Sequence, residues 1–228
     1  MINKFDHKQN NKVKKFYTKL NKKLNFCVPN ETIFRFISEF NFDFKKKNCL
    51  DIGIGNGDNL LEFKRRGANI FGIDIRDKII EIFIKKNKLK SKNFFNCDLN
   101  ENFPEIKKKI DLCLMKDTLY YINHKRRNIL FNKIYKILKK NGFFLFQYIQ
   151  SEYIVKKDNL FSYNFTKNSK KLKSFHLRDN PIIFIKEQEI KNLILDNKFK
   201  IKSSIFDINT HTKNRKIITV NRYFLLQK

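Results

Sequence analysis

Three glycines alternate with other residues in one short segment of the chain, Leu50-Asp51-Ile52-Gly53-Ile54-Gly55-Asn56-Gly57. Glycine lets the backbone turn sharply and lets a ligand approach it closely. The apolar run at the start of the segment predicts a strand, and the residues after it predict a helix, which is the context of a nucleotide-type binding loop. A glycine-rich turn without a ligand is the alternative. The alternating spacing and the acid at the end of the strand favour a binding site.

The acidic residues around this loop indicate the charge of its ligand. A dinucleotide places a pyrophosphate at the N-terminus of the following helix, and its pattern G-x-G-x-x-G needs a third glycine where this chain has Asp58. Asp51 and Asp58 would both lie near that anion. A ligand with an ammonium group and no phosphate would tolerate them. S-adenosylmethionine is such a ligand, because it carries an amino-acid head, a sulfonium and an adenosine.

Two further acids follow later apolar runs, so that three predicted strands end at a carboxylate. Asp74 follows residues 69–73, and Asp98 follows residues 93–97. Either acid alone could simply cap the next turn. Ligands of open α/β sheets bind at the carboxyl ends of the strands, so three acids at successive strand ends predict a shared cleft.

The elements that must position these residues alternate between strand and helix from residue 48 onward. Repeated strand–helix–strand units with short connections imply a parallel sheet with helices on both faces and right-handed crossovers. We predict a doubly wound, mostly parallel, seven-stranded α/β sheet with an antiparallel C-terminal hairpin at its edge. The expected strands are residues 49–52, 69–73, 93–97, 110–115, 143–149, 200–208 and 219–226, and the expected helices begin near residues 31, 59, 79, 129 and 187.

The same patterns set the domain boundaries. Residues 1–27 are rich in Lys and Asn, and we expect a basic N-terminal arm there. Residues 28–228 are predicted to form one domain. Residues 151–185 break the rhythm of strands and helices, and we interpret them as an insertion over the carboxyl edge of the sheet.

The formal net charge is +28, because 50 lysines and arginines outweigh 22 acids in 228 residues. Such a balance is typical of proteins that bind nucleic acid or anionic membranes. The excess is nearly all lysine, it is scattered, and it accompanies much Asn, Ile and Phe, which an AT-rich coding sequence also produces. We therefore favour a drifted composition over a dedicated RNA surface.

The composition also limits the class of protein. No apolar stretch approaches the roughly 18 residues that span a bilayer, and the polar start of the chain does not resemble a secretory signal, so we expect a cytoplasmic protein without a transmembrane segment. The cysteines form no CxxC pair and no histidine lies at metal-ligand spacing, so we expect no metal site. Cys49, Cys97 and Cys113 lie in or beside apolar runs and are predicted to be buried thiols.

Four segments of the chain resemble motifs of a known family, the class I S-adenosylmethionine-dependent methyltransferases. Residues 51–57 resemble its first motif, an acid followed by G-x-G-x-G, and Phe71-Gly72-Ile73-Asp74-Ile75 resembles the end of its second strand. Asn96-Cys97-Asp98-Leu99 is similar to its third-strand end, and residues 111–122 to its fourth-strand motif. The resemblance covers residues 28–150 well and the C-terminal hairpin loosely. The branch that it suggests acts on small molecules and glycans.

The resemblance implies S-adenosylmethionine as the cofactor and assigns roles to particular residues. Asp74 would bind the ribose hydroxyls, with Asp77 as an alternative further into the next helix, and Asp98 would accept from the adenine amino group. Arg35 would meet the methionine carboxylate, as in the entry helix of some relatives. The full set of expected cofactor-binding residues is Asp51, Gly53, Gly55, Gly57, Asp74, Ile75, Asp98, Leu99, Lys116 and Arg35.

The expected chemistry is in-line attack on the methyl carbon of the sulfonium, in which positioning does much of the work and a base removes the proton of the nucleophile. Asp117 is the first candidate for a substrate contact or base, and a helix cap is its alternative role. Tyr120 and His124 are further catalytic candidates. We expect O-methylation, ahead of N-methylation, of a small molecule or a sugar of a glycan precursor. An RNA methyltransferase and a non-catalytic basic binding module are the alternatives.

Overall fold

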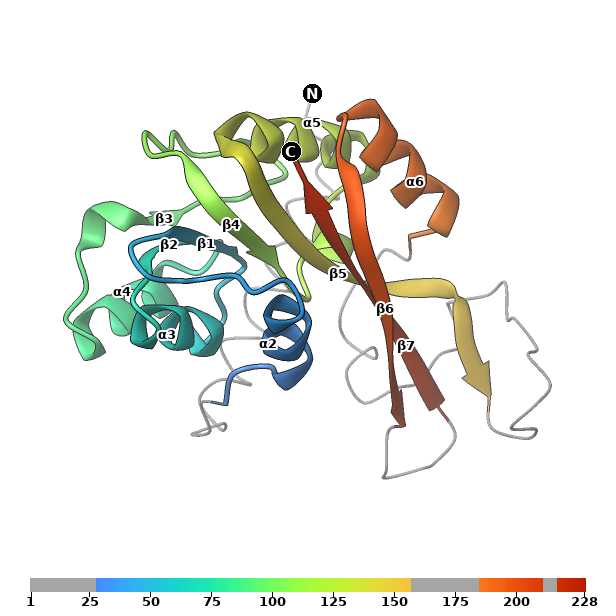
Figure 1. Ribbon diagram of the computed structural model, residues 1–228, viewed down its shortest axis with the longest axis horizontal. Coiled ribbons are helices and arrows are strands. Elements are labelled where there is room, and N and C mark those ends of the chain that lie inside the picture. Colours follow the sequence, from blue (N-terminus) through green and yellow to red (C-terminus); the bar gives the residue numbers. More distant parts are fainter. Residues whose placement is uncertain (1–27, 157–184, 211–216) are drawn as a thin grey trace.

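The computed structural model describes residues 28–156, 185–210 and 217–228 of the chain. These residues form one sheet with the strand order β3-β2-β1-β4-β5-β7-β6 (Figure 1). The strands β3, β2, β1, β4 and β5 are parallel to one another. The strands are β1 (Asn48–Ile52), β2 (Asn69–Asp74), β3 (Phe94–Asn96), β4 (Ile110–Met115), β5 (Leu138–Lys156), β6 (Lys200–Thr210) and β7 (Ile217–Gln227).

Helices cover both faces of this sheet, as predicted. The first group is α2 (Glu31–Ser38), α3 (Asp58–Arg65) and α4 (Asp77–Lys86), which pack on one face, and the second is α5 (His124–Ile137) and α6 (Glu187–Asp196), which pack on the other. Two short 3-10 helices, η1 (Ser91–Asn93) and η2 (Leu119–Tyr121), lie in the connections. The predicted doubly wound α/β fold is therefore confirmed. The longest described helix, α5, has 14 residues, and no described helix is long and apolar enough to cross a bilayer.

The central strands are buried on both faces, which explains why their sequences are almost continuously apolar. On β1, Leu50 and Ile52 belong to the hydrophobic cluster under α5 and α6, whereas Cys49 belongs to the cluster under α2, α3 and α4. All six residues of β4 are buried. Cys49, Cys97 and Cys113 are free, buried thiols, as predicted.

Local capping residues mark the start of α2 and the end of α3. The side chain of Asn30 accepts a hydrogen bond from the backbone N–H of Ile33 at 3.0 Å and caps α2. The chain leaves α3 through Gly67, whose φ of +92° lies in the left-handed region that favours glycine. These two signals fix where α2 begins and where the chain turns back into β2.

The fifth strand differs from its prediction at both ends. The predicted strand covers residues 143–149, but β5 already begins at Leu138. Asn141 has a φ of +63° within the strand, near the place where the pairing with β4 shifts register between Ile110 and Leu112. Residues 151–156, which were expected to begin the insertion, continue β5. The rest of the expected insertion, 157–184, and the expected arm, 1–27, lie outside the described residues.

The C-terminal hairpin is present, and β7 lies between β5 and β6. Only β7 runs against its neighbours, since it pairs in antiparallel fashion with both β5 and β6. The edge strand β6 therefore points the same way as the parallel strands. The consequence for the site is that β7 residues reach the carboxyl end of β5.

Candidate functional site

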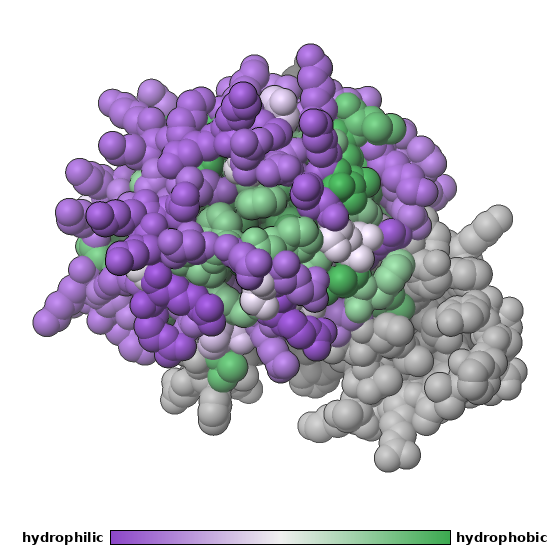
Figure 2. Space-filling model, viewed as in Figure 1, coloured by the Kyte–Doolittle hydropathy of each residue, from purple (hydrophilic) through white to green (hydrophobic). Residues whose placement is uncertain are grey.

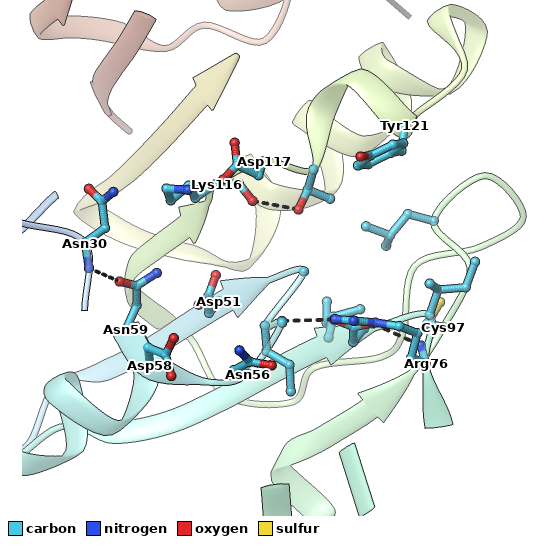
Figure 3. Close-up of a pocket in the computed structure, with 18 of the residues that line it drawn as sticks. Asn30, Asp51, Asn56, Asp58, Asn59, Arg76, Cys97, Lys116, Asp117 and Tyr121 are labelled. Carbon is cyan, nitrogen blue, oxygen red and sulfur yellow. Dashed lines mark hydrogen bonds and ion pairs between the residues drawn. The ribbon is translucent and has the colours of Figure 1, made fainter. Parts of the chain in front are cut away.

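A cavity of about 610 Å³ opens at the carboxyl ends of the parallel strands (Figure 3). Its volume lies in the range of roughly 300–1,000 Å³ that is usual for small-molecule sites. Its wall is drawn from the start of α2, the glycine turn and the loops after β2, β3 and β4, within residues 28–31, 51–59, 73–76, 97–100 and 116–122. The three acids that the sequence places at strand ends, Asp51, Asp74 and Asp98, all line it.

The glycine turn is shaped by close contacts with the rest of the protein. A Cβ on Gly53 would lie 2.0 Å from Oγ1 of Thr118, and Gly53 has a φ of +81°. Oγ1 of Thr118 donates to the carbonyl of Ile52 or of Lys116, at 3.1 and 2.9 Å, which fastens the loop after β4 to the glycine turn. Gly57 is also indispensable, but for packing, because a Cβ there would lie 1.9 Å from the ring of Phe83.

Asp51 lies at the base of the cavity, and only 2% of it is exposed. Burial raises the pKa of this carboxyl well above its usual value, and the negative charge of Asp74 raises it further, while Lys116 opposes them. Among the described residues we find no hydrogen-bond donor for its carboxylate, and Figure 3 shows it pointing into the cavity. A buried acid without a partner is costly, and a cation in the cavity would favour its ionised form.

Asp74 and Asp98 each stabilise the turn that follows their strand. Oδ1 of Asp74 accepts the backbone N–H of Arg76 at 3.0 Å, and Oδ1 of Asp98 accepts that of Asn100 at 2.9 Å. The capping role that was the alternative for these acids is therefore present. It coexists with their position in the cavity wall. Asp74 also forms an ion pair with the side chain of Arg76 at 2.9 Å, and both residues are buried.

Asp117 occupies the loop after β4 in a left-handed backbone conformation with φ +52°. Its carboxylate forms an ion pair with Lys116 and accepts a hydrogen bond from the hydroxyl of Tyr120 at 3.1 Å. Its backbone N–H donates to the buried side chain of Gln147 at 2.9 Å, and Gln147 in turn donates to Asn221 of β7 at 2.7 Å. The C-terminal hairpin thus holds a strained site residue in place. Helix capping, the alternative for Asp117, is not its role, since α5 is capped by Asn123.

The structure brings most of the predicted site residues together and leaves four outside the cavity wall. Those that line it are Asp51, Gly53, Gly55, Asp74, Ile75, Asp98, Leu99, Lys116 and Asp117. Gly57 packs against α4, and Tyr120 is buried below the cavity, where it contacts Asp117. Arg35 and His124 are exposed on α2 and at the start of α5.

Several residues of the wall were missed by the sequence analysis. They are polar side chains beside the predicted positions: Asn30, Glu31, Asn56, Asn59, Arg76 and Asn100. Asn100 bridges two loops, since its amide donates to the carbonyl of Tyr121 at 3.2 Å and its oxygen accepts the N–H of Asn123 at 2.7 Å. Adjacency to a strand end was the only available signal, and it does not distinguish these residues from ordinary turn residues.

The charge of the cavity is opposite to that of the chain. Among the residues that the structure describes, two cations line it, Arg76 and Lys116. Six carboxylates line it as well, which leaves a formal excess of four negative charges: Glu31, Asp51, Asp58, Asp74, Asp98 and Asp117. The whole chain carries +28, and Figure 2 shows hydrophilic residues over much of the described surface in that view. An excess of carboxylates repels a phosphate and attracts a cation. These residues therefore fit a cofactor with a sulfonium and an ammonium group.

Comparisons with known proteins agree with this geometry. A family model described as a methyltransferase domain matches residues 49–142. The ubiquinone biosynthesis O-methyltransferase of Pelagibacter ubique is 29% identical over 188 residues, which cover 74% of this chain and 75% of that enzyme. The phosphoethanolamine N-methyltransferase of Plasmodium falciparum is 31% identical over 101 residues, which cover 43% of this chain and 37% of that enzyme.

Solved structures share the fold at low sequence identity. An S-adenosylmethionine-dependent methyltransferase from Clostridium acetobutylicum has a TM-score of 0.63 and 16% identity, with 96% of this chain and 98% of that one covered. The magnesium protoporphyrin IX methyltransferase of Synechocystis with bound S-adenosylhomocysteine has a TM-score of 0.58 and 14% identity, with 100% of this chain and 88% of that one covered.

Proposed function

This chain belongs to the class I S-adenosylmethionine-dependent methyltransferases, and from that premise we propose that it methylates a hydroxyl oxygen of a small molecule or of a sugar in a glycan precursor. The observation that best supports binding of a cationic cofactor in the cavity is the excess of carboxylates around it, in a strongly basic chain. The preference for oxygen rests on the relative from Pelagibacter ubique, an O-methyltransferase with which the match covers three quarters of both chains. The match to the N-methyltransferase of Plasmodium falciparum covers only 43% of this chain and 37% of that enzyme.

The residues of the cavity suggest how the cofactor is held. When bound, S-adenosylmethionine supplies a methyl group that its sulfonium has already activated. In our proposal Asp51 faces the positively charged amino-acid head, Asp74 accepts from the ribose, and Asp98 accepts from the adenine amino group. The turn of Gly53 and Gly55 gives the cofactor close access to the backbone. The exposed position of Arg35 removes the support for its role at the carboxylate.

Asp117 is the residue that we propose contacts the acceptor hydroxyl and takes its proton. It lines the cavity beside Lys116, and the hydroxyl of Tyr120 together with the side chain of Gln147 fixes its orientation. Tyr120 then acts through Asp117, since it does not line the cavity. His124, the other candidate base, is exposed outside the cavity wall, which argues against it.

The test is methyl transfer from labelled S-adenosylmethionine to a panel of phenols, sugars, primary amines and RNA. We expect methylation of hydroxyl compounds, and product only from amines would overturn the choice of oxygen. Transfer to RNA that weakens steeply with added salt would instead support the basic surface as the substrate site.

The role of Asp117 needs its own variant. Asp117→Asn should lower kcat by roughly 10²–10⁴-fold, the usual contribution of a positioned base, and leave the affinity for S-adenosylhomocysteine within about twofold. The matched control is Asp196→Asn at the exposed end of α6, which should change neither quantity. Equal turnover of the two variants at every pH would remove Asp117 from the mechanism.

A further inference from the structure

The hydrogen-bonding capacity of Asp74 is used completely within the protein. Its Oδ1 accepts from the backbone N–H and from Nε of Arg76, at 3.0 and 2.9 Å. Its Oδ2 accepts from Nη2 of Arg76 and from the backbone N–H of Gly55, at 3.0 and 3.1 Å. An ionised carboxylate offers about four acceptor sites, so the observed arrangement leaves none for the hydroxyl groups of a ribose.

Arg76 holds this position by a two-pronged contact that is strong in a buried site. Only 6% of Arg76 and 5% of Asp74 are exposed, and both line the cavity. Figure 3 labels Arg76 in the cavity wall. A planar guanidinium matches the two oxygens of a carboxylate, and burial strengthens such a pair. The pair is therefore part of the cavity wall at the place where the proposed function puts the ribose.

The main chain of Arg76 has hydrogen bonds that do not involve its side chain. The carbonyl of Arg76 accepts the N–H of Ile80 at 3.3 Å in the first turn of α4, which anchors the main chain. Rotation of the side chain would free one acceptor site on Oδ1 and one on Oδ2, while the backbone donors of Arg76 and Gly55 stay. Two acceptor sites on adjacent oxygens suit two adjacent hydroxyl groups, such as those of a ribose.

We propose that Arg76 competes with the cofactor ribose for Asp74, and that the ribose engages Asp74 only after the Arg76 side chain has left it. This inference rests on the proposed role of Asp74 as the acceptor for the ribose. Arg76 is then a positioning residue that acts through Asp74 and lowers the contribution of the ribose hydroxyls to affinity. Part of the free energy that these hydroxyls supply is offset by the loss of the Arg76–Asp74 contacts.

The test compares the dissociation constants of S-adenosylhomocysteine and its 2′,3′-dideoxy analogue, measured by titration calorimetry on the full chain. In the wild type, the ratio of the two constants should be below about threefold. In Arg76→Leu it should rise to about tenfold or more, since hydrogen bonds to a free carboxylate are stronger. The matched control is Arg66→Leu, which also removes an arginine paired with a buried acid, Glu62, but outside the cavity. Its ratio should equal that of the wild type.

The ratios of the variants can support or overturn the competition between Arg76 and the ribose. A ratio in Arg76→Leu that equals or falls below the wild-type ratio would overturn the proposal, because a purely structural role of Arg76 would weaken both ligands alike. If Arg76→Leu does not fold, Arg76→Lys replaces the fork by a single ammonium, and its ratio must still exceed the wild-type ratio. In the double variant Asp74→Ala/Arg76→Leu the ratio should return to about one. A ratio that stays high there would instead show that Asp74 is not the ribose acceptor.

Discussion

At the amino end of the sheet, Asp111 of β4 accepts hydrogen bonds on both oxygens from Nζ of Lys139 at 2.9 Å and from the backbone N–H of Asn48 at 2.8 Å. At the carboxyl end, Asp51 of the neighbouring strand β1 is more deeply buried. The charged group with the largest effect on its pKa is another acid, Asp74, which raises it. Both acids lie on paired central strands. Only Asp111 is satisfied by the chain itself.

We propose that this difference separates an acid that stabilises the fold, Asp111, from an acid that binds a ligand, Asp51. Burial of a charge is costly unless it is paired, and Asp111 meets that requirement inside the protein. Asp51 does not, and burial, followed by the negative charge of Asp74, raises its pKa well above the usual value. A cationic cofactor would supply the missing charge.

Among variants at the two ends of the sheet, the largest expected effect comes from Asp51→Asn. We expect it to weaken S-adenosylmethionine binding by roughly 10–100-fold, because a buried contact to a charged group is lost. It should also raise the stability of the cofactor-free protein at neutral pH. The folded-state pKa of Asp51 is raised, so its ionisation opposes folding once the pH exceeds the unfolded value. Calorimetric titration and thermal unfolding measure the two effects, and weakened binding without a gain in stability would contradict the comparison.

The next largest effects are expected from alanine substitutions of one glycine at each end of the sheet. Gly53→Ala should cost about 2 kcal/mol of stability and weaken cofactor binding, because its φ is +81° and the new Cβ would meet Thr118 at 2.0 Å. Gly142→Ala at the amino end meets backbone oxygens no closer than 3.0 Å, and should cost about 1 kcal/mol without changing the affinity. Denaturant unfolding with ligand titration separates them, and equal effects on affinity would be inconsistent with a cavity at one end only.

Asp111→Asn is the structural counterpart of the first variant. It should lower the free energy of unfolding by about 1 kcal/mol, a modest value because Lys139 is half exposed and solvent weakens the ion pair. The affinity for S-adenosylmethionine should stay within about twofold of the wild-type value. A large loss of affinity in this variant would mean that the two acids do not have separate roles.

The smallest effect is a pH dependence of cofactor affinity. Protonation of Asp51 removes the charge that faces the cationic cofactor, and its pKa is raised by burial and by Asp74. The dissociation constant of S-adenosylmethionine should therefore rise by a few-fold between pH 7 and pH 5, below the range in which the cofactor amino group titrates. Asp51→Asn should lack this rise. A wild-type profile as flat as that of the variant would remove Asp51 from the binding site.

The sequence by itself determined the order of strands and helices along the chain and the end of the sheet at which the cavity opens. The run of Asp51, Asp74 and Asp98 at three strand ends was sufficient for this, because parallel strands place their carboxyl ends side by side. It also determined the class of ligand, since acids near a glycine turn disfavour phosphate. These features depend on residues that are close in sequence or on a general rule of sheet topology.

Only the tertiary structure decided which side chains share the cavity and which do not. Arg35 and Gly57 lie near the site in sequence, but helix geometry turns Arg35 outward and Gly57 packs on Phe83. Gln147 and Asn221, which hold Asp117, are 30 and 104 positions away from it and carry no local signal. Side-chain direction depends on what packs against each element, and long-range hydrogen bonds depend on the register of strands that fold back from the far end of the chain.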